Sequence, residues 1–546
     1  LVNLLLDLRD ANLFHGQIRP SNLFDGGNKE FDKVKVGECL SMPPGYSQNV
    51  VFEPIERAMT DPVGRGIGTV QDDLYSLGVT VFFLIRSKNP VEGMTDDEII
   101  RHKIEYGSYS MLSGKERYSS PLLELLRGIL NDTPGARWTL DDVNNWFEGQ
   151  RLSPKQSGRK VKANLPLEYK DEKYFRPGIL AIDMEEDVYE SARLIESDSI
   201  ANWCERSLED SSTTARVTDA KSSASEGAAG PNFNDQLVAR VRMALDPMAP
   251  IRYRGIHVHP EGLPYALAHA IAKDEDVSPF VDIIRQKLVN YWLALQYNPL
   301  LDVGTLASRF ENAQAIMLQQ NIGYGIERCL YYLCKEAPCY SDKTKGYYIR
   351  TPDDLMFAFE EISERKDRPE LFIDRHVAAF LSVKDKKVID SYLIEINAEE
   401  YYYRILGNIK TLALIQKVSK LPPFPGIAHW FADILEPVYE RLHDGEMRKR
   451  TKEQVEKLKI QGDLVKIALL FDRKDIFKKD YTSFREGMRE YSRLREELKM
   501  LEYKLQKPER FGIDMAKEVA SVVSGALAAI IIIGFIIVYF VQGVVL

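Results

Sequence analysis

The chain of 546 residues has few cysteines and no surplus of positive charge. Its five cysteines form no paired framework, which argues against an oxidising compartment and favours a reducing, cytosolic location. No signal peptide opens the chain, which begins at Leu1 without methionine. The formal net charge of −9 argues against a nucleic-acid partner, because no basic surplus is left to neutralise phosphates.

Composition otherwise indicates an ordinary globular protein. Charged residues at 28% and hydrophobic residues at 45% are globular values, so most of the chain can bury a core. The length predicts about three or four domains. No internal repeat of fixed period is present, so a solenoid is not supported.

One long apolar segment ends the chain. No charged residue occurs from Val519 to Leu546, and residues 519–541 are long enough to cross a bilayer core of about 30 Å. Positive residues lie on the N-terminal side of this segment, namely Lys504, Lys507, Arg510 and Lys517. The positive-inside tendency therefore predicts a single-pass, tail-anchored membrane protein with its soluble part in the cytoplasm.

Five short motifs follow one another between residues 1 and 149. They are Leu13–Asn22 (LFHGQIRPSN), Lys35–Leu40 (KVGECL), Phe52–Glu56 (FEPIE), Asp73–Gly78 (DLYSLG) and Pro134–Thr139 (PGARWT). In this order they resemble the catalytic loop, the magnesium-binding segment, the end of the activation loop, the start of the central helix and the late Pro-x-x-Arg motif of eukaryotic-like Ser/Thr protein kinases. The resemblance predicts a kinase-like C-lobe over residues 1–149. The Gly-rich loop and strand lysine of a kinase N-lobe occur nowhere in the chain, so the N-lobe is absent from it.

The positions nearest to chemistry depart from the kinase pattern. Gln17 replaces the catalytic aspartate, and Arg19 stands where Ser/Thr kinases usually carry lysine. Glu38 replaces the magnesium-binding aspartate, whereas Asn22 keeps the other metal-binding position. Glutamine has no proton-accepting carboxylate, so general-base assistance of about 10²–10⁴-fold is expected to be lost. The side chain of Glu38 is one methylene longer than that of aspartate, so its carboxylate oxygens are displaced. Magnesium demands near-octahedral geometry, and this displacement disfavours its binding.

The architectural positions are better kept. His15 fits the catalytic-loop pattern, and Glu56, Asp73 and Arg137 are buried polar or charged groups in kinases. The resemblance implies an ion pair between Arg137 and Glu56. The chain therefore resembles a pseudokinase that serves as a signalling or scaffold protein.

Two other functions stay open. One is an atypical active Ser/Thr kinase that uses Arg19, Asn22 and Glu38, with Mg-ATP as cofactor only where an N-lobe is present. The other is a membrane-tethered helical interaction protein with a relic kinase lobe. Partners are expected to be proteins that bind the lobe or the helical region.

The remaining chain reads as a mainly α succession of segments. We expect a basic linker at 150–169, a small unit of two or three helices at 170–207 and a disordered linker at 208–233. An all-helical domain of unrecognised family follows at 234–441, and a long charged helix with a short coiled coil at 442–507. The basic linker either contacts an anionic membrane face or is simply solvated; its cations are Arg151, Lys155, Arg159, Lys160 and Lys162.

The charged helix carries a row of apolar residues. They are Phe484, Met488, Tyr491, Leu494, Leu498, Leu501 and Leu505. The spacing of three and four residues is close to a heptad, the repeat of a coiled coil. Two interpretations remain open, a self-associating coiled coil and an amphipathic helix packed on its own domain.

Three further groups of side chains invite functional interpretations. His257 and His259, with Glu261 and His269, could bind a metal, but Pro260 and Gly262 favour a loop and no zinc-like spacing follows. Cys329, Cys334 and Cys339 recur every five residues, which points the sulfurs in different directions on a helix, so buried unreactive thiols are expected. The tyrosines at 401–403 are either phosphorylation targets or packing residues. No metal site is predicted.

Overall fold

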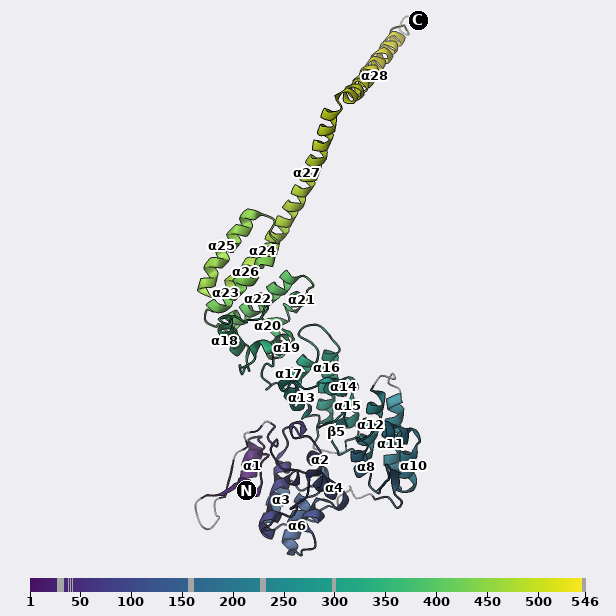
Figure 1. Ribbon diagram of the computed structural model, residues 1–546, viewed down its shortest axis with the longest axis vertical. Helices are drawn as coiled ribbons and strands as arrows, with labels where there is room; N and C mark the ends of the chain where they lie inside the picture. Colours follow the sequence, from purple (N-terminus) through teal and green to yellow (C-terminus); the bar gives the residue numbers. More distant parts are fainter. Residues whose placement is uncertain are drawn as a thin grey trace. The chain divides into compact units, whose positions relative to one another are not determined.

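The chain is mainly helical, as its sequence predicts: helices hold 64% of the residues and strands 4%. The computed structural model describes residues 1–26, 34–37, 39, 41, 43–155, 162–225, 232–296 and 301–542. The chain divides into two compact units, residues 1–397 and 398–546 (Figure 1).

Residues 1–149 form a helical cluster with a short hairpin. Its helices are α1 (Val2–Asp10), α2 (Ile55–Ala58), α3 (Val70–Arg86), α4 (Asp96–Tyr106), α5 (Ser108–Ser113), α6 (Ser120–Ile129) and α7 (Leu140–Phe147). Single 3₁₀ turns are η1 (Pro20–Asn22), η2 (Val50–Phe52), η3 (Pro62–Gly64) and η4 (Pro134–Ala136). The hairpin pairs β1 (Leu23–Asp25) with β2 (Val34–Val36) in antiparallel register.

Helix α3 supplies the centre of this cluster. It begins at a capping box, in which the backbone N–H and the hydroxyl of Thr69 donate to the Asp72 carboxylate at 2.8 and 3.0 Å. Its apolar side chains lie in one core with those of α1 and α6. Fully buried members are Leu5, Leu74, Val79, Phe82 and Leu126. Truncating such a leucine to alanine typically costs about 2–5 kcal/mol, so this core fixes the loops attached to α3.

Residues 163–245 form a second core, within the same unit. Its elements are β3 (Leu167–Tyr169), β4 (Glu172–Tyr174), α8 (Pro177–Asp183), α9 (Val188–Glu196), α10 (Ser199–Arg206), α11 (Ser211–Ser225) and α12 (Phe233–Leu245). The predicted basic linker thus ends before residue 167, where β3 starts. Arg159 and Lys160 lie outside the described residues.

The prediction of a disordered linker at 208–233 is wrong for residues 211–225, because they form α11. Val217, Ala220 and Ala224 of α11 are buried in the core with α10 and α12. Asp210 fixes the start of the helix by accepting from the N–H and hydroxyl of Thr213 at 3.1 and 2.6 Å. Small alanines let neighbouring helices approach closely, so this segment packs without large apolar side chains.

Residues 246–397 contain one hairpin followed by helices. The hairpin is β5 (Ile251–Tyr253) and β6 (Ile256–Val258), so the prediction of an all-helical segment from residue 234 is wrong here. Arg254 and Gly255, with φ of 49° and 78°, form its two-residue turn. The helices are α13 (Leu263–Ala272), α14 (Ser278–Arg285), α15 (Leu288–Ala294), α16 (Val303–Met317), α17 (Ile326–Leu333), α18 (Pro352–Ser363), α19 (Arg375–Lys384), α20 (Lys386–Ile389) and α21 (Leu393–Ile396), with the 3₁₀ turn η5 (Asp342–Thr344).

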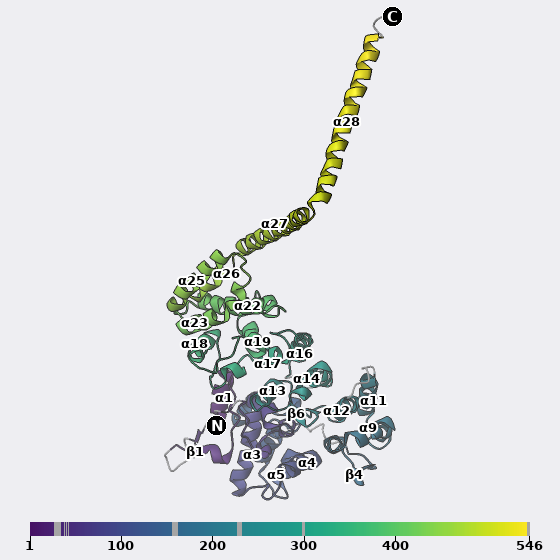
Figure 2. The same cartoon turned by 45° about the horizontal axis from the view of Figure 1, so that its top comes forward.

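The second unit is helical throughout its described length. Its elements are α22 (Tyr401–Val418), α23 (Pro425–Ile434), α24 (Glu436–Tyr439), α25 (Gly445–Gln461), α26 (Leu464–Phe471), α27 (Lys474–Gln506) and α28 (Pro508–Gln542) (Figure 2). Helix α26 packs on α22 and α25 packs on α23. The predicted boundary at residue 441 therefore cuts through one bundle. The predicted single helix at 442–507 is three helices, because α25 ends at Gly462 in the left-handed conformation.

The last two helices differ from the bundle in exposure. Side chains of α27 from Tyr481 to Tyr503 are exposed all round the helix. Within the described residues, α28 is the one helix long and apolar enough to cross a membrane, and it contains the predicted span at 519–541.

Candidate functional site

The loop at residues 13–22 is fixed by a buried carboxylate. Asp73, fully buried near the start of α3, accepts from the backbone N–H groups of His15 and Gly16, both at 2.8 Å. Burial raises the pKa of Asp73 to about 7, although these two hydrogen bonds oppose the shift. Gly16 has φ of 72°, and a Cβ there would lie 2.7 Å from the Pro44 carbonyl carbon. The close approach requires glycine at this position.

Gln17 holds the loop closed with its side chain. It is 4% exposed, and its Nε2 donates to the Pro44 carbonyl at 3.0 Å. Its backbone N–H donates to His15 Nδ1 at 3.2 Å, which leaves the proton of a neutral His15 ring on Nε2. That Nε2 lies 3.2 Å from the Gly37 carbonyl, and burial lowers the pKa of His15. Both side chains are thus used in positioning backbone.

Asn22 and Arg19 also bind backbone carbonyls. Asn22, 8% exposed, donates from Nδ2 to the Gln17 carbonyl at 2.9 Å. Arg19 donates to the Ser47 carbonyl at 2.7 Å. The N–H of Gly37 donates to the Asn22 carbonyl at 2.9 Å, so the segment leading to residue 38 lies beside Asn22. Glu38 itself lies outside the described residues.

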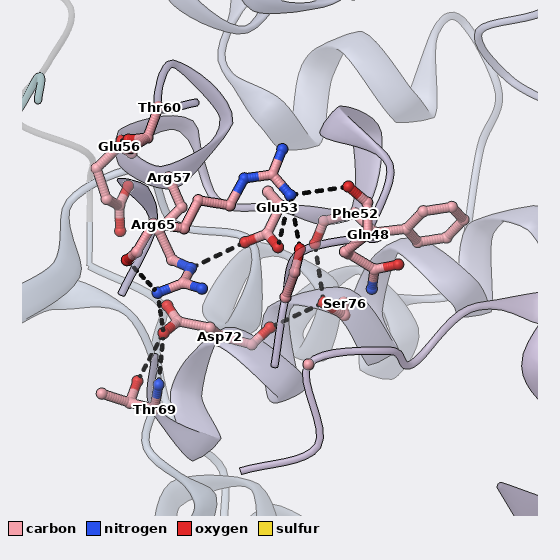
Figure 3. Close-up of polar contacts among 12 residues, drawn as sticks. Gln48, Phe52, Glu53, Glu56, Arg57, Thr60, Arg65, Thr69, Asp72 and Ser76 are labelled. Carbon is pink, nitrogen blue, oxygen red and sulfur yellow. Dashed lines mark hydrogen bonds and ion pairs between the residues drawn. The ribbon is translucent and has the colours of Figure 1, made fainter. Parts of the chain in front are cut away.

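Six charged residues, five of them buried and Glu56 partly buried, form a network of ion pairs, and Figure 3 labels all of them except Arg137. We call it the charge cluster; its members are Glu53, Glu56, Arg57, Arg65, Asp72 and Arg137. Arg137 donates to Glu56 at 2.9 Å, which confirms the predicted ion pair. Arg137 also lies 3.8 Å from Asp72, and its Nε donates to the Asn131 carbonyl at 2.9 Å. Three carboxylates and three guanidiniums balance, as buried charges require.

The other half of the charge cluster was missed in the sequence. Glu53, 2% exposed, lies 2.9 Å from Arg57 and 3.5 Å from Arg65. Arg57 also donates to the Arg65 carbonyl at 3.0 Å, and Arg65 donates to the Gly45 carbonyl at 2.9 Å. The signal that could have found them is three charged residues at 53, 56 and 57 within an otherwise apolar segment.

Lys103 of α4 was also missed. It is 1% exposed, and its ammonium donates to the carbonyls of Val50, Val51 and Glu53 at 2.9, 3.1 and 2.6 Å. Burial lowers the pKa of Lys103 to about 7. All three donors are used, so this cation fixes the turn η2 rather than facing a ligand.

The hairpin β5–β6 packs against the same region. The backbone N–H of Asp61 donates to the His257 carbonyl at 3.0 Å, and the N–H of His259 donates to the Gly64 carbonyl at 3.0 Å. Gly64 and Gly262 approach so closely that a Cβ on Gly262 would lie 1.8 Å from the Gly64 carbonyl oxygen. The segment 256–263 therefore belongs to the packing of the helical cluster at 1–149.

The two histidines serve this contact. His257 Nε2 lies 2.8 Å from the Glu185 carboxylate, and its backbone N–H donates to Asp61 at 2.9 Å. His259 Nε2 donates to the Glu56 carbonyl at 2.9 Å, and burial lowers the pKa of His259 to about 4. Among the described residues no group of three His, Cys, Asp or Glu is placed to hold a metal.

The remaining candidates have structural surroundings. Cys329, Cys334 and Cys339 are buried, as predicted, and burial raises the pKa of Cys329 and Cys339 to about 12. These thiols are protonated at neutral pH and unreactive. Tyr402 and Tyr403 lie against the Arg441 guanidinium, which is 3.9 and 4.9 Å from their ring centroids.

No family model, curated protein or solved structure matches the chain.

Proposed function

We propose that the chain is a membrane-anchored, kinase-like protein that binds partner proteins and does not transfer phosphate. The observation that carries this proposal is the side chain of Gln17. An amide stands where the resembling kinases have a carboxylate, and it is buried and bonded to the Pro44 carbonyl. No proton acceptor is left at that position for a substrate hydroxyl.

The contacts of the architectural residues support the kinase-like part of the proposal. Asp73 holds the loop that resembles the catalytic loop, from the start of the helix that resembles the central helix. Arg137 pairs with Glu56, as the motifs imply. The architectural residues Asp73, Glu56 and Arg137 therefore have the partners that the motifs imply. Gln17, at the position of the catalytic aspartate, instead binds a backbone carbonyl.

Helix α28 supports the anchored part of the proposal. Its uncharged length from Val519 suits a bilayer core, and its described side chains there are all exposed. Lys504, Lys507, Arg510 and Lys517 precede it, which favours the cytoplasm for residues 1–507.

A second candidate, an atypical active kinase, is favoured by one observation. The Asn22 carbonyl accepts from the N–H of Gly37 at 2.9 Å, so Asn22, which matches a magnesium-holding position of the resembling kinases, lies at the end of the hairpin β1–β2. Catalysis of phosphoryl transfer depends largely on positioning and electrostatics, which such a metal would supply.

Phosphate transfer decides between the two. The chain joined to a kinase N-lobe that carries the Gly-rich loop and the strand lysine is placed in phospholipid vesicles and incubated with γ-labelled ATP, magnesium and a generic protein substrate, next to its Gln17→Asp and Asn22→Ala variants. We expect no label in any protein, because restoring one carboxylate leaves the remaining motifs altered. Labelling by the natural chain that disappears in Asn22→Ala would contradict the proposal and establish the second candidate.

A further inference from the structure

The second half of α27 presents a row of apolar side chains to solvent. Tyr491, Leu494, Leu498, Leu501 and Leu505 are 58, 51, 55, 49 and 81% exposed. They advance by three, four, three and four residues, so they occupy alternating a and d positions of a heptad. An apolar row of this regularity on a helix that the described residues leave uncovered indicates a binding surface.

Two residues near the start of α27, Asp480 and Phe484, contact its own bundle. The Asp480 carboxylate accepts from the backbone N–H groups of His443 and Asp444, both at 2.9 Å. Phe484 stacks on the His443 ring with centroids 3.9 Å apart. Phe484 lies seven residues before Tyr491, at the equivalent a position. The exposed row thus continues an existing contact beyond the point where the bundle ends.

We propose that residues 491–505 of α27 pair with the same residues of a second copy as a short parallel coiled coil. Two copies anchored through α28 in one membrane have the same orientation, so their α27 helices run parallel. Two heptads are short for an independent coiled coil, and anchorage supplies the high local concentration that a weak pair needs. The parallel direction rests on the proposed anchor, whereas the choice of face does not.

Charges beside the row suit this pairing in part. With Tyr491 at a, Glu490 and Glu497 occupy g positions, and Arg495 and Glu502 occupy e positions. In a parallel pair each g residue faces the e residue of the next heptad. Glu490 then faces Arg495 of the second copy, which is favourable, whereas Glu497 faces Glu502, which is not.

Glu490 is available for this contact. Its carboxylate lies 2.6 Å from Arg493 of its own helix, but both side chains are more than half exposed. Such exposed pairs contribute little and exchange readily. One favourable and one unfavourable contact predict a reversible association rather than a permanent dimer.

Disulfide crosslinking of the whole chain in phosphatidylcholine vesicles tests the face. Cys39 is the exposed native cysteine and is first changed to serine; the other four are buried. Leu498→Cys places a thiol on the row, and Glu496→Cys places one on the opposite face as the matched control. Under mild oxidation we expect several-fold more crosslinked dimer from Leu498→Cys.

Equal crosslinking at both positions would overturn the proposed face. No crosslinking at position 498, with that thiol shielded from a water-soluble reagent only when vesicles are present, would show that α27 lies on the lipid surface and would overturn the pairing. A truncated chain ending at Lys507 separates the anchor from the pairing. It should crosslink less at position 498 at equal concentration, and a crosslinked fraction equal to that of the anchored chain would overturn the role given to the anchor.

Charge variants test the register. In the Leu498→Cys background, Arg495→Glu should lower the crosslinked fraction by opposing Glu490, and adding Glu490→Arg should restore it. Glu502→Lys should raise the fraction by relieving the contact with Glu497. A crosslinked fraction that stays the same in all three variants would refute a parallel pair in this register.

Discussion

Removing Arg137 should strongly destabilise the helical cluster at 1–149. Arg137 is 4% exposed, lies 2.9 Å from Glu56 and donates to the Asn131 carbonyl. In Arg137→Met the Glu56 carboxylate and the Asn131 carbonyl both lose the hydrogen bond from Arg137. Breaking a buried ion pair in this way typically costs about 3–5 kcal/mol. That is a large part of the total stability of most domains, which is about 5–15 kcal/mol.

A double-mutant cycle separates the ion pair from the rest of the site. Glu56→Gln alone should cost less, because Arg137 keeps Asp72 as a second carboxylate at 3.8 Å. In the double variant Arg137→Met with Glu56→Gln no isolated charge is left, so the losses should not add. We expect a coupling energy of about 1–3 kcal/mol between the two positions.

Hydrogen exchange of the α3 amides is the suitable assay, because a unit that extends from Leu1 to Asn397 is too large for a two-state analysis. The opening free energy of these buried amides reports the region around Arg137 directly. Arg9→Met is the matched control in the same helical cluster, since Arg9 lies 2.6 Å from Asp141 but the two side chains are 41% and 73% exposed. Additive losses at Arg137 and Glu56, or an equal effect at Arg9, would refute the reasoning.

Three more predictions concern pH, the membrane and the hairpin. Burial lowers the pKa of His259 from 6.5 to about 4, so His259 takes up a proton in the unfolded chain before it does so in the folded chain as pH falls. The stability that comes from the neutral ring is complete above pH 6.5. It is lost towards pH 4 at up to about 1.4 kcal/mol per pH unit. Opening free energies from hydrogen exchange of the α3 amides at pH 7 and 4.5 should show this loss in the natural chain and less of it in His259→Gln, and equal pH dependence would contradict it. Deleting everything after Lys517 should move the protein from the membrane to the soluble fraction on centrifugation, and retention in the pellet would disprove the anchor. Gly262→Ala should lower the melting temperature because its Cβ meets the Gly64 carbonyl, whereas Gly304→Ala, which meets only Asp302 Oδ1 at 3.8 Å, should not; equal effects would show that the close approach is misjudged.

The sequence predicts contacts where a pattern carries both partners. Arg137 and Glu56 are 81 residues apart, and their pairing follows from the order of the motifs that contain them. Composition alone predicts α28, a helix long and apolar enough to cross a membrane, because the segment is long and uncharged. The spacing of apolar residues by three and four positions predicts most of the helices. It also predicts the apolar row on α27.

Other features depend on contacts that no local pattern records. Helix α11 lacks large apolar residues, so its composition resembles a linker, yet Ala220 and Ala224 are fully buried because neighbouring helices come close. Lys103 looks like a surface lysine until η2 places three carbonyls around its ammonium. The β5–β6 hairpin was hidden because its turn, Arg254–Gly255, lacks the usual asparagine or aspartate.

The contact between Gly64 and Gly262 can form only after both residues have been synthesised. A ribosome adds about 5–20 residues per second, so Gly262 is made about 10–40 s after Gly64 itself. During that interval Asp61 and Gly64 lack the backbone partners that β6 and the residue after it supply. The helical cluster at 1–149 therefore emerges from the ribosome before the segment that covers Asp61 and Gly64 has been made. A chaperone that binds this uncovered surface would act before residues 256–263 emerge.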